Sequence, residues 1–381
     1  MPSWSIDFLA TAPPEDITSG LSRTVWELAA ALVVRGHRVR VLYPDPLVAS
    51  REPYRGVGRI PVPLVGVSRR PFGRDIAIGH NASRLLDPAA DVVVGTDEKA
   101  GAMALPRKST AVFGMFAFDV SLHTFETLRP LEKRTGFRKK MGDWLDRGTL
   151  RRLEKGALER ARFVLVGSEL NQKLLMQYYR VPTERTEVVP IGVPDPIDVG
   201  SRADARLALH IPADVPVVAF IGRTPDRQGL PIALNTFRRV RVFFPGARFL
   251  VVGCVGASEP GVTNLGVVDE VTKGRVLRAA DVFLFPAVYE GFGVAPREAM
   301  RYGLATIVSS HVPVDGLPVG TGIRVVNEDT PEAYASDLAE LLADPALRRQ
   351  MAVVGQHAAD EFSYGRMAER FERVVQRARA S

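Results

Sequence analysis

The feature that most constrains the fold is an alternation of short apolar strands and amphipathic helices along most of the 381-residue chain. An apolar strand over Ile6–Ala10 precedes a helix whose apolar residues recur at helical spacing from Val25 to Val33, and Val39–Tyr43 is the next strand. Strands connected through helices lie parallel to one another, with the helices covering the sheet. The alternation therefore predicts an α/β protein built on parallel sheets.

The alternation restarts after a loop-like segment that begins at Asp195 and contains Pro196 and Gly200. We predict two Rossmann-like domains, over residues 1–195 and 196–362, that face each other across a cleft, and a basic helix over residues 363–381. In the second domain the predicted strands are Val217–Ile221, Phe249–Gly253, Val282–Phe285 and Ala305–Ser309, and the predicted helices are Leu230–Val242, Val271–Ala280 and Pro296–Tyr302. Ligands of open parallel sheets bind beyond the carboxyl ends of the strands, so we expect functional residues there.

Charge and composition narrow the class of protein. The chain carries 50 lysine and arginine residues against 43 aspartate and glutamate residues, a formal net charge of +7. This favours anionic partners such as nucleotides, phosphosugars, acidic lipid surfaces or nucleic acid, without choosing among them. The single cysteine, Cys254, excludes an internal disulfide and fits a reducing compartment. The N-terminus lacks signal-peptide features and no apolar run reaches about 18 residues, so we expect a cytoplasmic protein without a membrane span.

The segment from Val288 to Met300 carries the strongest functional signal. Glu290 follows a predicted strand and is flanked by glycines, and Glu298 is predicted in the first turn of a helix that starts at Pro296. A glycine-containing loop at a helix N-terminus exposes backbone N–H groups that suit a phosphate. The two carboxylates can each hold hydroxyls of a sugar or ribose. The alternative is that both glutamates only stabilise the helix N-terminus, which Glu290 fits poorly.

This segment resembles the signature of the retaining glycosyltransferases of family 4, which have the GT-B fold. The signature has two glutamates separated by seven residues, as Glu290 and Glu298 are, and the chain also matches it at Gly291, Phe292, Gly293, Ala299 and Met300. The resemblance implies that Glu290 contacts the donor sugar, that Glu298 holds the nucleotide ribose, and that the backbone of Phe292–Val294 faces the sugar and diphosphate.

Other segments extend the likeness over most of the chain. Residues 188–193 resemble the end of the family's first domain, and Ala279–Pro286 resembles its approach to the signature. Asn264–Val268 resembles the segment that holds the nucleotide base, which makes Val268 a donor-binding candidate. Phe362–Tyr364 resembles the entry to the final helix, which in the family crosses back to the first domain.

A second motif follows the first strand of the second domain. Gly222 and Arg223 match a Gly-Arg pair of the family, in which the arginine would neutralise the departing diphosphate; a surface ion pair is the alternative role for Arg223. The family has a lysine directly before the next glycine, and Gln228 occupies that position here. Arg227 is adjacent and could replace this lysine, although its side chain leaves the backbone in a neighbouring direction.

Two weaker motifs lie in the first domain. In the family a glycine-rich loop before the first helix approaches the donor phosphates, and Ser19 and Gly20 lie at this place with one glycine only. The family often has a histidine after the strand that begins at Phe113, and Asp119 and His123 are the nearby polar candidates. A lone loop histidine is more often merely solvated, so the alternative is that His123 is exposed to solvent and has no role in the site.

The stretch 129–162 is basic and interleaved with Trp144, Leu145 and Leu150. Relatives that use lipid acceptors touch the membrane with such a region, which would place this protein peripherally at the inner face of the membrane. Acidic residues dilute the charge, and we favour a solvated helical pair or a wall that attracts anionic acceptors.

The sequence therefore predicts a metal-independent, retaining hexosyltransferase that moves a sugar from UDP or GDP to a small-molecule or lipid-linked acceptor lying against the first domain. We expect no cofactor, no metal site and no nucleic-acid partner. Two alternatives stay open: a GT-B nucleotide-sugar epimerase, whose extra acid/base carboxylates we do not identify, and a non-catalytic protein that binds sugar nucleotides, which the missing lysine and histidine motivate.

Overall fold

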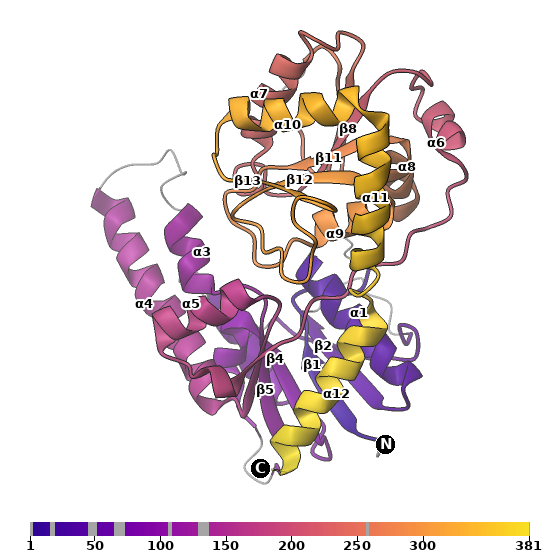
Figure 1. The fold of residues 1–381 in the computed structure, drawn as a ribbon. Helices are drawn as coiled ribbons and strands as arrows, with labels where there is room; N and C mark the ends of the chain where they lie inside the picture. The colour runs from indigo at the N-terminus through magenta and orange to yellow at the C-terminus, as the bar shows by residue number, and fades with distance from the viewer. Residues whose placement is uncertain are drawn as a thin grey trace. The chain divides into compact units, whose positions relative to one another are not determined.

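The computed structural model describes residues 3–15, 20–44, 52–64, 73–105, 109–128, 137–256 and 259–380. The chain divides into two compact units (Figure 1). The N-terminal unit comprises Met1–Gly192 together with Tyr364–Ser381, and the C-terminal unit comprises Val193–Ser363. The boundaries predicted from the sequence are residues 195 and 362.

In the described residues the N-terminal unit has a seven-stranded parallel sheet with the strand order β3-β2-β1-β4-β5-β6-β7. The strands are β1 Ser5–Leu9, β2 Arg38–Pro44, β3 Gly58–Val62, β4 Val92–Thr96, β5 Val112–Ala117, β6 Phe163–Val166 and β7 Thr186–Val188. The helices are α1 Gly20–Val34, α2 Gly73–Ser83, α3 Ser121–Leu128, α4 Phe137–Arg160, α5 Glu169–Tyr179 and α12 Tyr364–Ala380, with short 3₁₀ turns at Asp97–Ala102 and Thr183–Arg185.

The C-terminal helix α12 belongs to the N-terminal unit, where it packs beside α1 (Figure 1). Its apolar face places Phe371 5.5 Å from the Phe8 ring. Its most buried polar contact is made by Glu372, which is 2% exposed and accepts two 2.7 Å hydrogen bonds from Arg35. His37 adds a 2.9 Å contact to the same carboxylate. A buried carboxylate is tolerated when it is paired in this way, and here the pairs attach α12 to the turn that follows α1.

The C-terminal unit repeats the architecture with a parallel sheet of six described strands in the order β10-β9-β8-β11-β12-β13. The strands are β8 Val217–Ile221, β9 Arg248–Val252, β10 Val262–Gly266, β11 Val282–Phe285, β12 Ala305–Ser309 and β13 Arg324–Val326. The helices are α6 Arg202–Ala208, α7 Leu230–Val240, α8 Glu270–Ala279, α9 Val294–Arg301, α10 Pro331–Ala343 and α11 Pro345–Ala359. The fold class predicted from the alternation, two Rossmann-like α/β domains, is confirmed.

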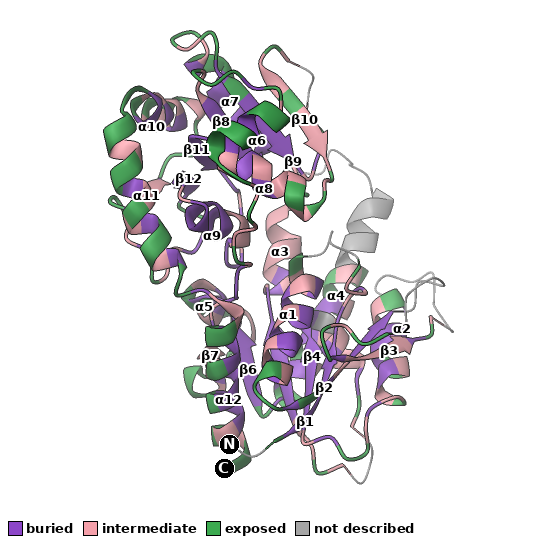
Figure 2. Cartoon of the chain, turned by 90° about the vertical axis from the view of Figure 1, so that its right-hand side faces the viewer, coloured by how far each residue is buried: buried purple, intermediate pink, exposed green. Residues whose placement is uncertain are grey.

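The core of each unit lies along the central strands. All residues of β1, β4, β11 and β12 are buried, and Figure 2 shows these strands between more exposed helices. Strands buried on both faces read as largely apolar runs, as in β4 and β11, whereas β1 also buries Ser5 and Asp7. In the C-terminal unit the strand order reverses between β8 and β11, so the loops after these two strands emerge side by side. Such a reversal is where α/β sheets bind ligands.

No helix in the described ranges combines the length and apolar character needed to cross a membrane.

Candidate functional site

The loops that follow β8 and β11 form one structure at the carboxyl edge of the C-terminal sheet. Gly229 ends the first loop with a φ of +77°, and a Cβ atom there would lie 1.7 Å from the carbonyl oxygen of Pro286, which follows β11. The Arg227 carbonyl also accepts a 2.8 Å hydrogen bond from the Val288 N–H. The tertiary fold therefore brings together the two motifs that the sequence analysis identified separately.

Gln228, the residue at the family's lysine position, turns back into its own loop. Its Oε1 accepts the backbone N–H groups of Arg223 at 2.6 Å and Thr224 at 3.0 Å. A single amide oxygen thus satisfies two loop donors that would otherwise need water or a ligand. Gln228 therefore shapes the loop that carries Arg223.

Arg227 reaches across to the signature loop. Its Nε donates to the Tyr289 carbonyl at 3.2 Å, and its guanidinium lies 5.2 Å from the centroid of the Tyr289 ring. Its Nη2 is 3.6 Å from Oε1 of Glu290, and both side chains are less than a fifth exposed, at 19% and 17%. Arg227 therefore holds the carboxylate that the resemblance assigns to the donor sugar.

Arg223 is exposed at the end of β8 beyond Gly222. Within the described part of the chain, no carboxylate pairs with its guanidinium, so the ion pair considered as its alternative role is not formed there.

In the signature loop, Gly291, Phe292 and Gly293 are buried, and Glu290 is half-buried. Gly293, with a φ of +83°, is the N-cap of α9, which begins at Val294. The predicted start at Pro296 was therefore wrong by two residues. Proline is tolerated here because the first-turn N–H groups need no partner inside the helix. The prediction that Glu298 lies in the first turn was wrong for the same reason, since the helix has begun before Pro296.

Glu298 is 5% exposed and is held by a residue that the sequence analysis missed. Lys273, from α8, places its Nζ 2.6 Å from Oε1 of Glu298 and 2.9 Å from Oε2 of Glu270. The Lys273 side chain is 12% exposed, so this is a largely buried charge cluster. The spacing of Glu270 and Lys273 on one helix face was readable in the sequence, but their proximity to Glu298 was not.

Arg297 lies between the two glutamates in sequence and is completely buried. Its guanidinium donates to the carbonyl oxygens of Phe292 and Gly293, and it stacks 3.9 Å from the centroid of the Phe292 ring. Burial lowers the pKa of Arg297 to about 9, against the opposing effect of the Asp315 and Glu290 charges.

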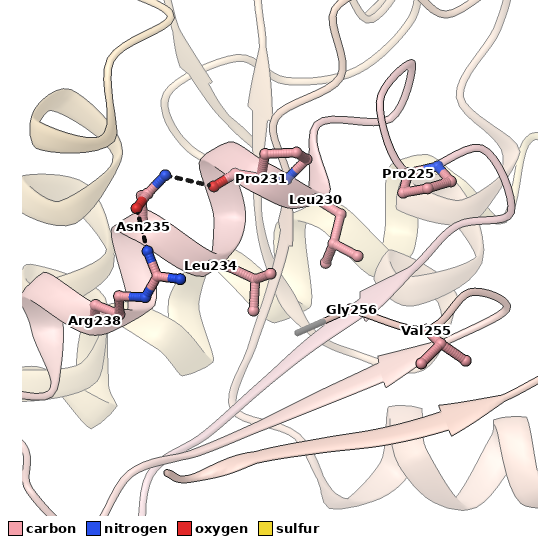
Figure 3. Close-up of a pocket in the computed structure, with 8 residues that line it drawn as sticks. All are labelled: Pro225, Leu230, Pro231, Leu234, Asn235, Arg238, Val255 and Gly256. Atoms are coloured by element: carbon pink, nitrogen blue, oxygen red, sulfur yellow. Dashed lines mark hydrogen bonds between the residues drawn. The ribbon is translucent and has the colours of Figure 1, made fainter. Parts of the chain in front are cut away.

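The remaining candidate of the C-terminal unit, Val268, follows the end of β10. Val268 is half-buried between β10 and α8. A separate pocket beside the first loop contains none of the candidate residues (Figure 3). It is lined by Pro225, Leu230, Pro231, Leu234, Asn235, Arg238, Val255 and Gly256.

The described candidates of the N-terminal unit lie at or near the starts of α1 and α3. Ser19 lies outside the described residues, and Gly20 is the first residue of α1 with open space on its Cβ side. Asp119 is half-buried before α3. His123 lies in the first turn of α3, with its Nδ1 3.2 Å from the Tyr178 hydroxyl, and burial lowers its pKa. His123 is therefore part of a helix-to-helix contact and is not merely solvated.

The basic stretch 129–162 is described only in part, since residues 129–136 lie outside the described ranges. In the described part of α4, Arg147 pairs with Glu126 at 2.7 Å and Lys155 pairs with Glu159 at 3.5 Å. These pairs neutralise two of the cations counted in the sequence.

Solved structures with this architecture define the class of fold. The chain superposes on a sucrose-phosphate synthase from Thermosynechococcus elongatus with a TM-score of 0.76, at 20% identity and 99% coverage of both chains. It superposes on WaaG, a glycosyltransferase involved in lipopolysaccharide biosynthesis, with a TM-score of 0.72, at 20% identity over 97% of this chain and 99% of that one. The fold is that of a GT-B glycosyltransferase.

The sequence matches assign the family. A Glycosyltransferase Family 4 profile matches residues 18–195, and a profile of Glycosyl transferases group 1 matches residues 215–344. The chain belongs to glycosyltransferase family 4. It is 34% identical to a D-inositol 3-phosphate glycosyltransferase of Segniliparus rotundus over 51% of this chain and 47% of that protein, so the match spans about half of that relative. It is 26% identical to a phosphatidyl-myo-inositol mannosyltransferase of Mycobacterium tuberculosis over 95% of this chain and 94% of the relative.

Proposed function

We propose that the protein transfers a hexose-type sugar from a nucleotide diphosphate, UDP or GDP, to a hydroxyl of a small-molecule or lipid-linked acceptor, with retention at the anomeric carbon. The observation that carries the proposal is the joined pair of loops after β8 and β11, where Arg223, Glu290 and Glu298 come to one edge of one sheet. Cations and backbone N–H groups at such an edge suit a diphosphate, and carboxylates suit sugar and ribose hydroxyls.

Each group has a distinct part in the proposal. Glu290 accepts hydrogen bonds from hydroxyls of the donor sugar, and Arg227 holds its carboxylate at 3.6 Å. Glu298, fixed by Lys273 at 2.6 Å, accepts the ribose hydroxyls. Arg223 and the loop N–H groups bind the diphosphate and stabilise the charge that develops on it as it leaves. These interactions require no metal, so we propose a metal-independent enzyme.

The proposed reaction breaks the bond between the anomeric carbon and the diphosphate oxygen and forms a glycosidic bond to the acceptor oxygen on the same face. The acceptor proton passes to a phosphate oxygen of the leaving diphosphate, which avoids the need for a protein nucleophile. The names of the two relatives point to inositol phosphate or phosphatidyl-myo-inositol acceptors, and this chain's net charge of +7 suits an acceptor that carries phosphate. A cytoplasmic location, with the alternative of peripheral membrane contact through residues 129–162, belongs to this proposal.

The test is turnover of UDP- and GDP-linked hexoses supplied in turn, followed as release of the nucleoside diphosphate. We expect Glu290→Ala to remove turnover while leaving the circular dichroism spectrum unchanged. Glu328→Ala is the matched control, because Glu328 is an exposed carboxylate of the same unit. Full activity of the Glu290 variant would refute the assignment of the donor site.

One observation favours a second candidate function. Gln228 is used to hold its own loop, so the family's leaving-group lysine has no direct replacement at its own position. A non-catalytic protein that binds sugar nucleotides would tolerate this. Nucleotide binding without turnover of any donor, with or without an acceptor, would select this candidate.

A further inference from the structure

A buried cation, Arg297, lies in α9 directly behind the signature loop. Its side chain is 0% exposed, and within the described residues no carboxylate forms an ion pair with it. Burying a charge without an ion-pair partner costs several kcal/mol unless other groups compensate, and the more distant charges of Asp315 and Glu290 offset this cost only in part. An apolar residue of similar volume would pack this position at a lower cost.

The partners of Arg297 are backbone carbonyls and aromatic rings. Nη1 donates to the Phe292 carbonyl and, at 3.3 Å, to the Gly293 carbonyl, while Nη2 donates to the Asp315 carbonyl at 3.4 Å. The guanidinium lies 3.9 Å from the centroid of the Phe292 ring and 4.8 Å from that of the Phe362 ring. The planar fork of arginine suits this combination of stacking and several donors, and lysine does not.

These contacts fix the orientation of two peptide groups. In a trans peptide the carbonyl of one residue and the N–H of the next point in opposite directions. Because the Phe292 and Gly293 carbonyls point toward Arg297, the N–H groups of Gly293 and Val294 point away from it. These two N–H groups belong to the N-cap and first residue of α9, where the helix supplies no acceptor for them.

A side chain on residue 293 would disturb this arrangement. Gly293 has a φ of +83°, and its Cβ would lie 3.3 Å from Nη1 of Arg297 and 2.8 Å from the Val312 side chain. The loop backbone therefore lies directly against the guanidinium.

We infer that Arg297 is a positioning residue for an anionic phosphate group: it turns the Gly293 and Val294 N–H groups toward the diphosphate and adds a fixed positive charge behind them. The inference rests on the proposed function, because it takes the bound anion to be the diphosphate of the donor. Arg297 touches no substrate and acts through the loop backbone. A role in packing alone would affect stability and every ligand of the unit equally.

The test compares ligands with and without phosphate. The affinities of the full-length protein for UDP, GDP, uridine and guanosine are measured by isothermal titration calorimetry, with displacement titrations for the weak ligands. For Arg297→Met we expect the affinity for the preferred nucleoside diphosphate to fall about tenfold or more, since two donors to a charged group are misaligned. The affinity for the matching nucleoside should stay within about twofold.

Arg206→Met is the control, because Arg206 is another buried arginine of the same unit that donates to carbonyl groups, those of Ala279, Pro212 and Ala213. It differs from Arg297 in also pairing with Asp281 at 2.9 Å. If it lowers diphosphate affinity selectively as well, the inference is overturned. An equal loss for nucleoside and diphosphate in Arg297→Met, or no loss, also overturns it.

Arg297→Lys keeps the charge but loses the fork, and it serves if the methionine variant does not fold. It should show a smaller loss, again confined to the diphosphate, and an unselective loss or none overturns the inference. A wild-type protein that binds nucleosides and nucleoside diphosphates equally weakly refutes the proposed function and this inference together. Tight diphosphate binding by both the wild type and the Arg297 variants refutes the role of Arg297 alone.

Discussion

Replacing Arg227 with methionine should impair turnover because three contacts between the two loops are lost. The change removes the 3.2 Å hydrogen bond to the Tyr289 carbonyl, the 3.6 Å pair with Glu290 and the cation–π contact at 5.2 Å with the Tyr289 ring. Methionine keeps most of the volume of the arginine side chain, so the packing around its aliphatic part is retained.

The size of the effect follows from these contacts. A hydrogen bond contributes about 1 kcal/mol, a partly exposed ion pair up to about 1 kcal/mol, and a cation–π contact at least about 0.5 to 1 kcal/mol. If the loss of about 2 to 3 kcal/mol falls entirely on the orientation of Glu290 in the transition state, kcat/KM falls roughly 30- to 150-fold. An effect below about threefold would show that Arg227 neither orients Glu290 nor replaces the missing lysine.

A double-mutant cycle separates these two roles of Arg227. Steady-state release of the nucleoside diphosphate is measured for the wild type, Arg227→Met, Glu290→Gln and the double variant. If Arg227 acts through Glu290, its replacement should cost little once Glu290 is changed, with a coupling energy above about 0.5 kcal/mol. Additive losses would refute the positioning argument and favour direct contact between Arg227 and the diphosphate.

Three further outcomes can be checked independently. Gly229→Ala should lower the free energy of unfolding in urea by about 3 kcal/mol or more, because its Cβ would meet the Pro286 carbonyl at 1.7 Å and its φ is +77°. The control Gly246→Ala, whose Cβ would have an ordinary 3.7 Å contact, should be nearly neutral. Equal effects of the two substitutions would contradict the clash. Lys273→Met should remove the counter-charge of Glu298 and reduce about tenfold the preference for a nucleoside diphosphate over its 2′,3′-dideoxy analogue; an unchanged preference would separate Glu298 from the ribose. EDTA should leave turnover unchanged, and strong inhibition that Mn²⁺ reverses would show that the proposed metal-independent mechanism is wrong.

Much of the fold was predictable because local patterns determine it. The apolar run Val282–Phe285 was predicted as a strand and forms β11, because a strand buried on both faces reads as a short continuous apolar run. The predicted helix over Tyr364–Ala380 is α12. The start of α9 was predicted two residues late, at Pro296, because proline is accepted anywhere in the first turn of a helix and so does not mark its first residue.

The sequence by itself determined the two α/β units and the motif with Glu290 and Glu298, because strand and helix periodicity and a contiguous signature are local properties of the chain. Only the tertiary structure decided which groups hold these glutamates. Lys273 reaches Glu298 from α8, and Arg227 reaches Glu290 from the loop after β8. The pairing of Arg227 with Glu290 depends on the strand order that makes β8 and β11 neighbours, and spacing along the chain does not encode that order.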